Sequence, residues 1–479
     1  MKISVYIQRD IAEFFKFSNA FTISLSIRAS CRDHRFLQNS AMKRFLLSLL
    51  PIIACSPILA DEDGNWPRLR GENGSGVVNS ATIPPVWKDE SFAWKTTLPG
   101  AGNGSPVVWG DRIFLLSAKP AESAKPAAAA EKGTKKKKAK KPATPQVWMP
   151  VCVDAKDGSI LWSYEFSDGA FKGHKFNTAA SSTPAVDSKR VVFTWGTAAK
   201  LTMIAFSHAG KKLWEKDLGP VNGGHGFGAS PTLIGDLVVL NNDQEKGAGN
   251  LLAVNAKTGE LAWTVERRSQ RISYSIPCLF KSGDRELLMF TNWQHGFTAI
   301  DPKDGSVVAD KSVFNADTNE RAISSPILAG NGIVIGTCGF TANPKHCVAM
   351  KLNGSELEEI WRIERNVPHI PSPIVVGENA YLWDDAGIIT CVKAATGEEF
   401  WKARLEGAEG SFFGSPVSDG KSIFCADESG NIHSIAVSTE GLKVLGKNKI
   451  ADECRTTPAI GKNVMFVRAG ESLVAVNGL

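Results

Sequence analysis

One short pattern recurs eight times along this 479-residue chain: a small residue, a proline, two or three apolar residues and then a turn. The eight prolines are Pro106, Pro184, Pro231, Pro277, Pro326, Pro373, Pro416 and Pro458. Successive prolines lie 78, 47, 46, 49, 47, 43 and 42 residues apart, and the first interval is long because it contains a Lys/Ala/Pro-rich insert over residues 119–146. A repeat of this length is typical of the blades of a propeller.

Each repeat predicts four short strands. In the third repeat, a turn at residues 235–236 follows the proline strand, and Leu237–Leu240 forms the second strand. Leu251–Asn255 is the third strand, and after a glycine turn the fourth strand carries Trp263. Alternating apolar residues between glycine-bearing turns indicate antiparallel strands, and four strands per unit make a propeller blade. We therefore predict an all-β fold, an eight-bladed antiparallel β-propeller.

The two ends of the repeat region predict how the ring closes. The last repeat has only three strands before the chain ends at Leu479. The segment 93–98, which contains Trp94, has the features of a fourth strand but belongs to no repeat. Pairing this N-terminal strand with the last repeat would complete the eighth blade and remove the exposed edges of an open ring.

A block around the third and fourth strands resembles a known repeat. Its best copies are Ala253–Trp263 and Val151–Trp162, and one copy has Val308 in place of the tryptophan. The block is similar to the quinoprotein-type repeat, Ala-x-Asp-x-x-x-Gly-x-x-x-Trp. Over about residues 64–479 the chain resembles pyrroloquinoline-quinone-like β-propeller repeat proteins of the secreted bacterial type. The segment Asn65–Gly74 matches the Trp-Pro-x-x-Arg-Gly opening of that type.

The resemblance implies two classes of function. Quinone-dependent alcohol dehydrogenases of this family hold pyrroloquinoline quinone (PQQ) with a calcium ion, using an adjacent-cysteine disulfide, carboxylate and amide ligands and an Asp base. The lipoprotein that assists outer-membrane β-barrel assembly uses the same ring as a binding platform without a cofactor. This sequence has no adjacent cysteines and no recognisable ligand set. We predict a non-enzymatic binding scaffold for a protein or cell-envelope polymer, without metal, cofactor or catalytic residue. A PQQ- and calcium-dependent alcohol or sugar dehydrogenase-like oxidoreductase with a degenerate site is the alternative.

Residues just before the inner strands are expected at the mouth of the central channel. Three His, two Arg and two Asn among them suit an anionic or sugar-like ligand, or a partner peptide, and the three His come from different repeats. The predicted binding residues are Asn103, His174, Asn177, His225, Tyr274, Arg321, His369, Phe413 and Arg455.

The N-terminal residues predict export. Residues 42–60 have the charged start, apolar stretch and small-residue end of a signal peptide. Residues 1–41 lack this pattern and are expected to be a mis-assigned extension, which leaves residues 61–479 as a single propeller domain. We expect a secreted or periplasmic protein. Cys55 also fits a lipobox, so an outer-membrane lipoprotein with a lipid anchor at Cys55 is the alternative. No apolar run is long enough for a transmembrane span.

The distribution of charge excludes one class of partner, and the cysteines suggest one disulfide. The formal charge is +6, but residues 1–60 and the insert 119–146 carry more than this between them, so the remaining chain is acidic. A nucleic-acid partner is therefore not expected, and the insert is expected to be a disordered loop. Cys338 and Cys347, which are expected to face each other across a hairpin, are the candidate disulfide. We expect the protein to be a monomer.

Overall fold

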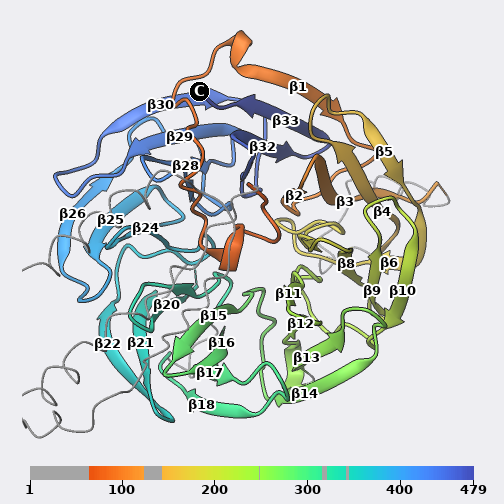
Figure 1. The fold of residues 1–479 in the computed structure, drawn as a ribbon, viewed down its shortest axis with the longest axis horizontal. Coiled ribbons are helices and arrows are strands. Elements are labelled where there is room, and N and C mark those ends of the chain that lie inside the picture. The colour runs from red at the N-terminus through yellow and green to blue at the C-terminus, as the bar shows by residue number, and fades with distance from the viewer. Residues whose placement is uncertain (1–63, 123–142, 248, 315–320, 341–344) are drawn as a thin grey trace, which may run out of the picture. The chain divides into compact units, whose positions relative to one another are not determined.

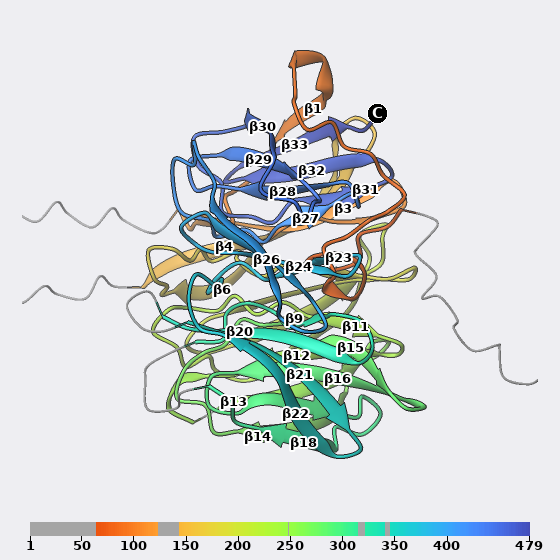
Figure 2. The same cartoon turned by 90° about the vertical axis from the view of Figure 1, so that its left-hand side faces the viewer.

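The computed structural model describes residues 64–122, 143–247, 249–314, 321–340 and 345–479. All of these residues belong to the chain's second compact unit, residues 60–479. Eight antiparallel sheets stand around a common axis (Figure 1), and a view turned by 90° shows their depth (Figure 2). The predicted eight-bladed β-propeller is confirmed. The predictions for residues 1–41, 42–60 and Cys55 lie outside the described residues.

The first four blades follow the repeats in order from the inner to the outer strand. Blade 1 is β2 (Val107–Trp109), β3 (Arg112–Pro120), β4 (Thr144–Asp154) and β5 (Ile160–Ser163), with an added strand β6 (Phe166–Phe171) on β4. Blade 2 is β7 (Ala185–Val186), β8 (Val191–Gly196), β9 (Leu201–Phe206) and β10 (Lys212–Asp217). Blade 3 is β11 (Thr232–Ile234), β12 (Leu237–Asn242), β13 (Gly249–Asn255) and β14 (Leu261–Arg267). Blade 4 is β15 (Cys278–Ser282), β16 (Arg285–Asn292), β17 (Gly296–Ile300) and β18 (Val307–Lys311).

The last four blades have the same order. Blade 5 is β19 (Ile327–Leu328), β20 (Ile333–Cys338), β21 (His346–Asn353) and β22 (Glu356–Ile363). Blade 6 is β23 (Ile374–Val376), β24 (Asn379–Trp383), β25 (Ile388–Lys393) and β26 (Glu399–Arg404). Blade 7 is β27 (Val417–Ser418), β28 (Ser422–Ala426), β29 (Asn431–Ala436) and β30 (Val444–Lys449). Blade 8 is β31 (Ala459–Gly461), β32 (Val464–Ala469), β33 (Ser472–Asn477) and β1 (Phe92–Thr97). Helix in the described residues consists of the 3-10 turns η1 (Glu72–Gly74), η2 (Asp89–Ser91) and η3 (Glu245–Gly247).

The ring closes as predicted, because the N-terminal β1 pairs antiparallel with β33 in blade 8. A buried arginine strengthens this junction. The guanidinium of Arg468, on β32, donates to the backbone carbonyls of Gly100, Gly104 and Leu116, which belong to or precede blade 1. The last blade is therefore tied to the first by side-chain hydrogen bonds as well as by packing.

The repeated tryptophan joins neighbouring blades. Its indole N–H donates to a carbonyl in the following blade, from Trp94 to Ala155, Trp162 to His208, Trp214 to Ala256, Trp263 to Pro302, Trp361 to Ala394 and Trp401 to Ser438. The prediction that Val308 takes this place in blade 4 is wrong. Ala309 lies opposite Ala299 there, just as Trp263 lies opposite Ala253 in blade 3, so Ala309 takes the place of the tryptophan.

The insert is shorter than predicted. β3 and β4 remain paired as far as Pro120 and Gln146, so both ends of residues 119–146 are strand. β6 supplies the reason, since it pairs with β4 from Thr144 to Trp148 and gives the lengthened strand a second partner. The prediction of disorder over the whole insert is wrong at these ends, and residues 123–142 lie outside the described residues.

The predicted disulfide is also wrong. Cys338 lies opposite His346, whereas Cys347 lies opposite Thr337. The two cysteines are thus one position apart in register, and side chains alternate between the faces of a strand. Cys338 packs into the core shared with blade 4 and Cys347 into the core shared with blade 6.

Candidate functional site

A ring of hydroxyl groups surrounds the propeller axis. The residue before each repeat proline is Ser or Thr in seven of eight blades, and Ile276 is the exception. Its backbone N–H donates to the hydroxyl of the next blade at 2.9–3.1 Å, from Ser105 to Thr183, Thr183 to Ser230, Ile276 to Ser325, Ser325 to Ser372, Ser372 to Ser415, Ser415 to Thr457 and Thr457 to Ser105. Each hydroxyl therefore accepts one bond from the scaffold, and all seven line the same cavity.

The first part of the N-terminal segment 64–91 lies across the channel beneath this ring, where Figure 1 shows it at the centre of the propeller. Its later part runs outward to β30, where Trp87 N–H donates to Asn448 Oδ1. The first part is held by inner strands from several blades. Hydrogen bonds run from Val186 N–H to the Pro67 carbonyl, from Arg68 to the Pro277 carbonyl, from Arg70 to the Pro373 carbonyl and from Ser418 N–H to the Gly76 carbonyl. Leu69 lines the cavity, so the segment forms its floor.

The packing of this floor depends on a glycine with a positive φ. Trp66 is 1% exposed, and Gly71 has a positive φ of 65°. A Cβ on Gly71 would lie 2.6 Å from the Trp66 ring, so only glycine allows this turn to pack there. Burial lowers the pKa of Arg68 to about 10 and that of Arg70 to about 9, and both remain charged at neutral pH. The opening motif of the sequence thus builds the floor of the channel.

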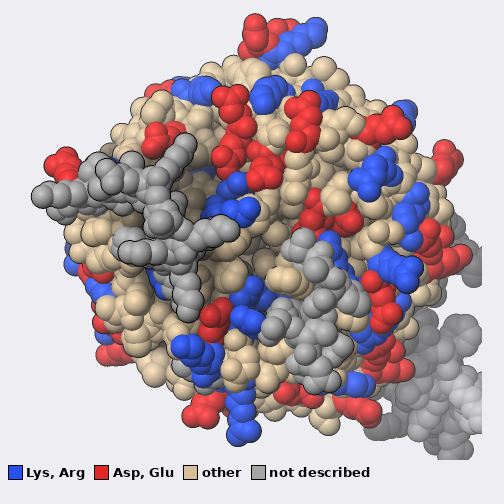
Figure 3. All heavy atoms as spheres, turned by 180° about the vertical axis from the view of Figure 1, so that it is seen from behind, with Lys and Arg blue, Asp and Glu red and all other residues tan. Residues whose placement is uncertain are grey.

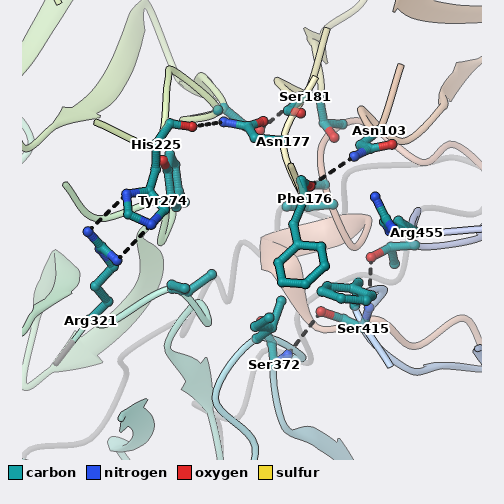
Figure 4. Close-up of a pocket in the computed structure, with 18 of the residues that line it drawn as sticks. Asn103, Phe176, Asn177, Ser181, His225, Tyr274, Arg321, Ser372, Ser415 and Arg455 are labelled. Atoms are coloured by element: carbon teal, nitrogen blue, oxygen red, sulfur yellow. Dashed lines mark hydrogen bonds between the residues drawn. The ribbon is translucent and has the colours of Figure 1, made fainter. Parts of the chain in front are cut away.

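All nine predicted channel-mouth residues line one cavity of about 510 Å³ on the axis: Asn103, His174, Asn177, His225, Tyr274, Arg321, His369, Phe413 and Arg455. Figure 4 shows six of them around the cavity, namely Asn103, Asn177, His225, Tyr274, Arg321 and Arg455. They are brought together because the loop before each inner strand ends at the axis. This geometry supports the predicted location, and what the residues bind remains a prediction.

One wall of the cavity is built around two histidines. The rings of His174 and His225 stack with their centroids 4.8 Å apart. Arg321 donates to His225 Nδ1 at 3.1 Å and to Glu245 Oε1 at 3.1 Å. Burial, with the Arg321 cation next in importance, lowers the pKa of His225 to about 4. His225 is therefore neutral at pH 7 and accepts from the guanidinium. Tyr274, nearby, donates to the Gly226 carbonyl at 2.8 Å.

The opposite wall is aromatic and cationic. The Phe176 and Phe413 rings lie 5.1 Å apart, and the Arg455 guanidinium lies 5.3 Å and 5.2 Å from their centroids. Lys175 lies 4.5 Å from the Phe176 centroid. Asn103 donates to the Phe176 carbonyl at 3.2 Å. The loop from blade 2 thereby reaches the mouth residues of blades 7, 8 and 1.

His369 lies between these walls. Its backbone N–H donates to Asp385 at 3.2 Å, and Asp385 also pairs with Lys345. Burial lowers the pKa of the His369 imidazole, so it too is neutral at pH 7. No hydrogen bond between described residues uses its Nε2 atom, which is buried.

Sequence reasoning missed part of the site. It identified neither the floor nor the hydroxyl ring, and it left out the wall residues Lys175, Phe176 and Phe340. A signal for the ring was present, because seven of the eight residues before the repeat prolines carry a hydroxyl. Nothing in the irregular segment 64–91 marks it as a channel floor.

The cavity is a poor match for a quinone–calcium pair. Calcium in proteins takes six to eight oxygen ligands, usually including carboxylates. Neither Asp nor Glu is among the residues that line this cavity. Within the described part of the chain, no group of three or more His, Cys, Asp and Glu side chains is placed to hold a metal ion. The lining therefore lacks the ligand set that such a calcium ion needs.

The surface and the described helices give two further findings. On the face opposite that of Figure 1, acidic and basic side chains are interspersed (Figure 3). None of the helices in the described ranges has the length and hydrophobicity needed to cross a bilayer.

Comparison with known proteins places the chain in a family. The family described as outer membrane protein assembly factor BamB matches residues 150–403 and 385–479. BamB from Moraxella catarrhalis is similar in structure with a TM-score of 0.54 and 12% identity, covering 81% of this chain and 97% of that one. Quinohemoprotein alcohol dehydrogenase from Comamonas testosteroni has a TM-score of 0.59 and 10% identity, covering 87% of this chain and 81% of that one. A europium-containing methanol dehydrogenase has a TM-score of 0.50 and 12% identity, covering 88% of this chain and 91% of that one.

These structural likenesses establish the fold alone, since their identities are low. No curated protein sequence matches the chain significantly. The family match, in contrast, extends over more than half of the chain. The protein therefore belongs to the family of outer membrane protein assembly factor BamB, and it is a β-propeller of the pyrroloquinoline-quinone-like repeat type.

Proposed function

We propose that this protein is a non-enzymatic scaffold that binds a protein or cell-envelope polymer through the mouth of its channel. The observation that carries the proposal is the lining of the axial cavity. It combines hydroxyls, aromatic rings and the cations Lys175, Arg321 and Arg455 with no lining carboxylate. Such a lining suits recognition, whereas general acid–base chemistry needs a base poised near the working pH. His225, with its pKa of about 4 and both ring nitrogens toward Arg321, is not such a base.

The proposed setting is the bacterial cell envelope, with the protein acting as a monomer. The signal over residues 42–60 and the membership of the BamB family support a secreted or periplasmic location. Lipidation at Cys55 would instead place it at the outer membrane. Fractionation of cells that express wild type or Cys55→Ser distinguishes the two forms, because only a lipid-anchored protein would leave the membrane fraction on substitution.

Cross-linking tests the scaffold function directly. A photo-reactive residue replaces Phe340, which lines the cavity and is 37% exposed, in a protein spanning residues 61–479. The matched control carries the same residue at Leu261, which is 61% exposed on the outer strand β14. We expect envelope extracts to give a discrete protein or polymer adduct at position 340 and none at 261. Equal labelling at both positions, or none at either, would overturn the proposal.

A quinone-dependent dehydrogenase remains the second candidate, favoured by the likeness of fold to the Comamonas testosteroni enzyme. PQQ has anionic groups that the three cations of the cavity could meet. Titration with PQQ and calcium, followed by tryptophan fluorescence, separates the candidates. The scaffold proposal expects no saturable change. Calcium-dependent quenching that is lost in Arg321→Ala, together with dye reduction by alcohols or sugars, would favour the enzyme.

A further inference from the structure

We infer that the axial cavity binds the end of an acidic saccharide chain. This inference rests on the proposed function and deepens it, since it assigns the ligand class of the channel mouth. The cavity volume of about 510 Å³ is that of a small-molecule site. Its floor is the N-terminal segment, with Leu69 in the cavity wall. Because this floor closes the channel, a polymer cannot pass through it. The site therefore suits the end of a polymer chain.

The hydroxyl ring favours a sugar over other anionic ligands. Each of its seven hydroxyls accepts one backbone N–H, and in the described residues none of the hydrogen bonds uses their O–H groups. A hydroxyl in that state still offers one donor and one remaining acceptor site. Sugar hydroxyls need both kinds of partner, whereas a carboxylate only accepts. The ring therefore matches a polyol better than a purely acidic peptide.

The aromatic wall supplies a second feature of sugar sites. Phe176 is 40% exposed and lies against Phe413 in the cavity. The face of an aromatic ring carries partial negative charge, which attracts the weakly positive C–H groups on one side of a pyranose ring. Phe340, 37% exposed, adds further apolar surface at the mouth.

The cations indicate that the sugar is acidic. Arg321 and Arg455 line the cavity, while their partners Glu245 and Glu428 do not. Charge-assisted bonds between a guanidinium and a carboxylate are strong ones. A uronate carboxyl group entering the cavity would meet the guanidinium groups of these two lining arginines.

Calorimetric titration of residues 61–479 tests the inference with three probes of similar size. These are trigalacturonate, the uncharged trisaccharide maltotriose and the peptide tri-aspartate. We expect trigalacturonate to bind at least tenfold more tightly than the other two, with affinity that falls as salt screens the charges. Maltotriose binding as tightly would indicate a neutral-sugar site, and tri-aspartate binding as tightly would indicate an anion site. Either result would overturn the inference.

Two substitutions complete the test. Arg455→Met is expected to lower trigalacturonate affinity about tenfold, while Arg285→Met, an exposed position on β16, leaves it unchanged. Ser372→Ala, in the hydroxyl ring, provides a second variant whose folding is checked by thermal melting. If trigalacturonate does not bind but cross-links form at position 340, the inference fails and the scaffold function stands. If neither occurs, both fail.

Discussion

The floor and the mouth of the channel both hold arginines, but in different surroundings. Arg68 and Arg70 in the floor are buried, and their partners among the described residues are backbone carbonyls. Arg321 and Arg455 at the mouth pair with carboxylates, and their side chains are 7% and 16% exposed. The floor arginines tie a chain segment to the inner strands, whereas the mouth arginines face a cavity. The contrast shows that arginines near one axis differ in role: those of the floor stabilise the fold, and those of the mouth are the ones that we propose bind a ligand.

The largest expected effect comes from the floor. Trp66→Ala removes a fully buried indole that packs on the Gly71 turn, and it should lower the free energy of unfolding by about 3–5 kcal/mol. Urea denaturation measures this change. Trp87→Ala, on the same segment but only partly buried, is the matched control and should cost clearly less. Equal losses would mean that the floor contributes no more to the stability of the fold than the rest of the segment does.

The hydroxyl ring lies between the two levels and should show an intermediate effect. Ser372→Ala leaves the Ser325 N–H, a buried donor, without its partner. An unsatisfied buried donor costs about 1–3 kcal/mol, which urea denaturation resolves. Ser355→Ala, an exposed serine in a turn of blade 5, should change stability negligibly. No difference between the two variants would show that the ring adds nothing to blade packing.

Mild acid should lower the stability of the fold through the buried histidines of the mouth. The folded-state pKa of His225 is about 4, below its ordinary 6.5, because burial and Arg321 disfavour the imidazolium. The unfolded chain therefore binds this proton first, and stability declines as pH falls from 6.5 towards 4. His369, also buried and with a lowered pKa, acts in the same direction. His225→Gln should have a smaller fall in melting temperature than wild type over this range. If His225→Gln had the same dependence of melting temperature on pH as wild type, the lowered pKa of His225 would be contradicted.

The repeat carried most of the fold and the location of the site. Regular proline spacing predicted eight blades, and the nine residues chosen from the loops before the inner strands are among those that line the cavity. Features set by long-range contacts could not be predicted this way. The floor depends on bonds such as Arg68 to Pro277, 209 residues apart, and segment 64–91 has no periodicity. Cys338 and Cys347 failed for a local reason, because spacing alone does not reveal register.

The smallest expected change in stability belongs to the mouth arginine. Arg455→Met removes ion pairs with Glu428 and Glu453 that are partly exposed, and such pairs contribute at most about 1 kcal/mol. Methionine also retains much of the apolar contact with Phe176 and Phe413. Urea denaturation should therefore give a midpoint near that of wild type, even though the same variant is expected to bind trigalacturonate poorly. A loss of stability comparable to that of Trp66→Ala would instead mean that Arg455 holds blades 7, 8 and 2 together. In that case the mouth arginine would stabilise the fold as the floor does, and the distinction between floor and mouth would be wrong.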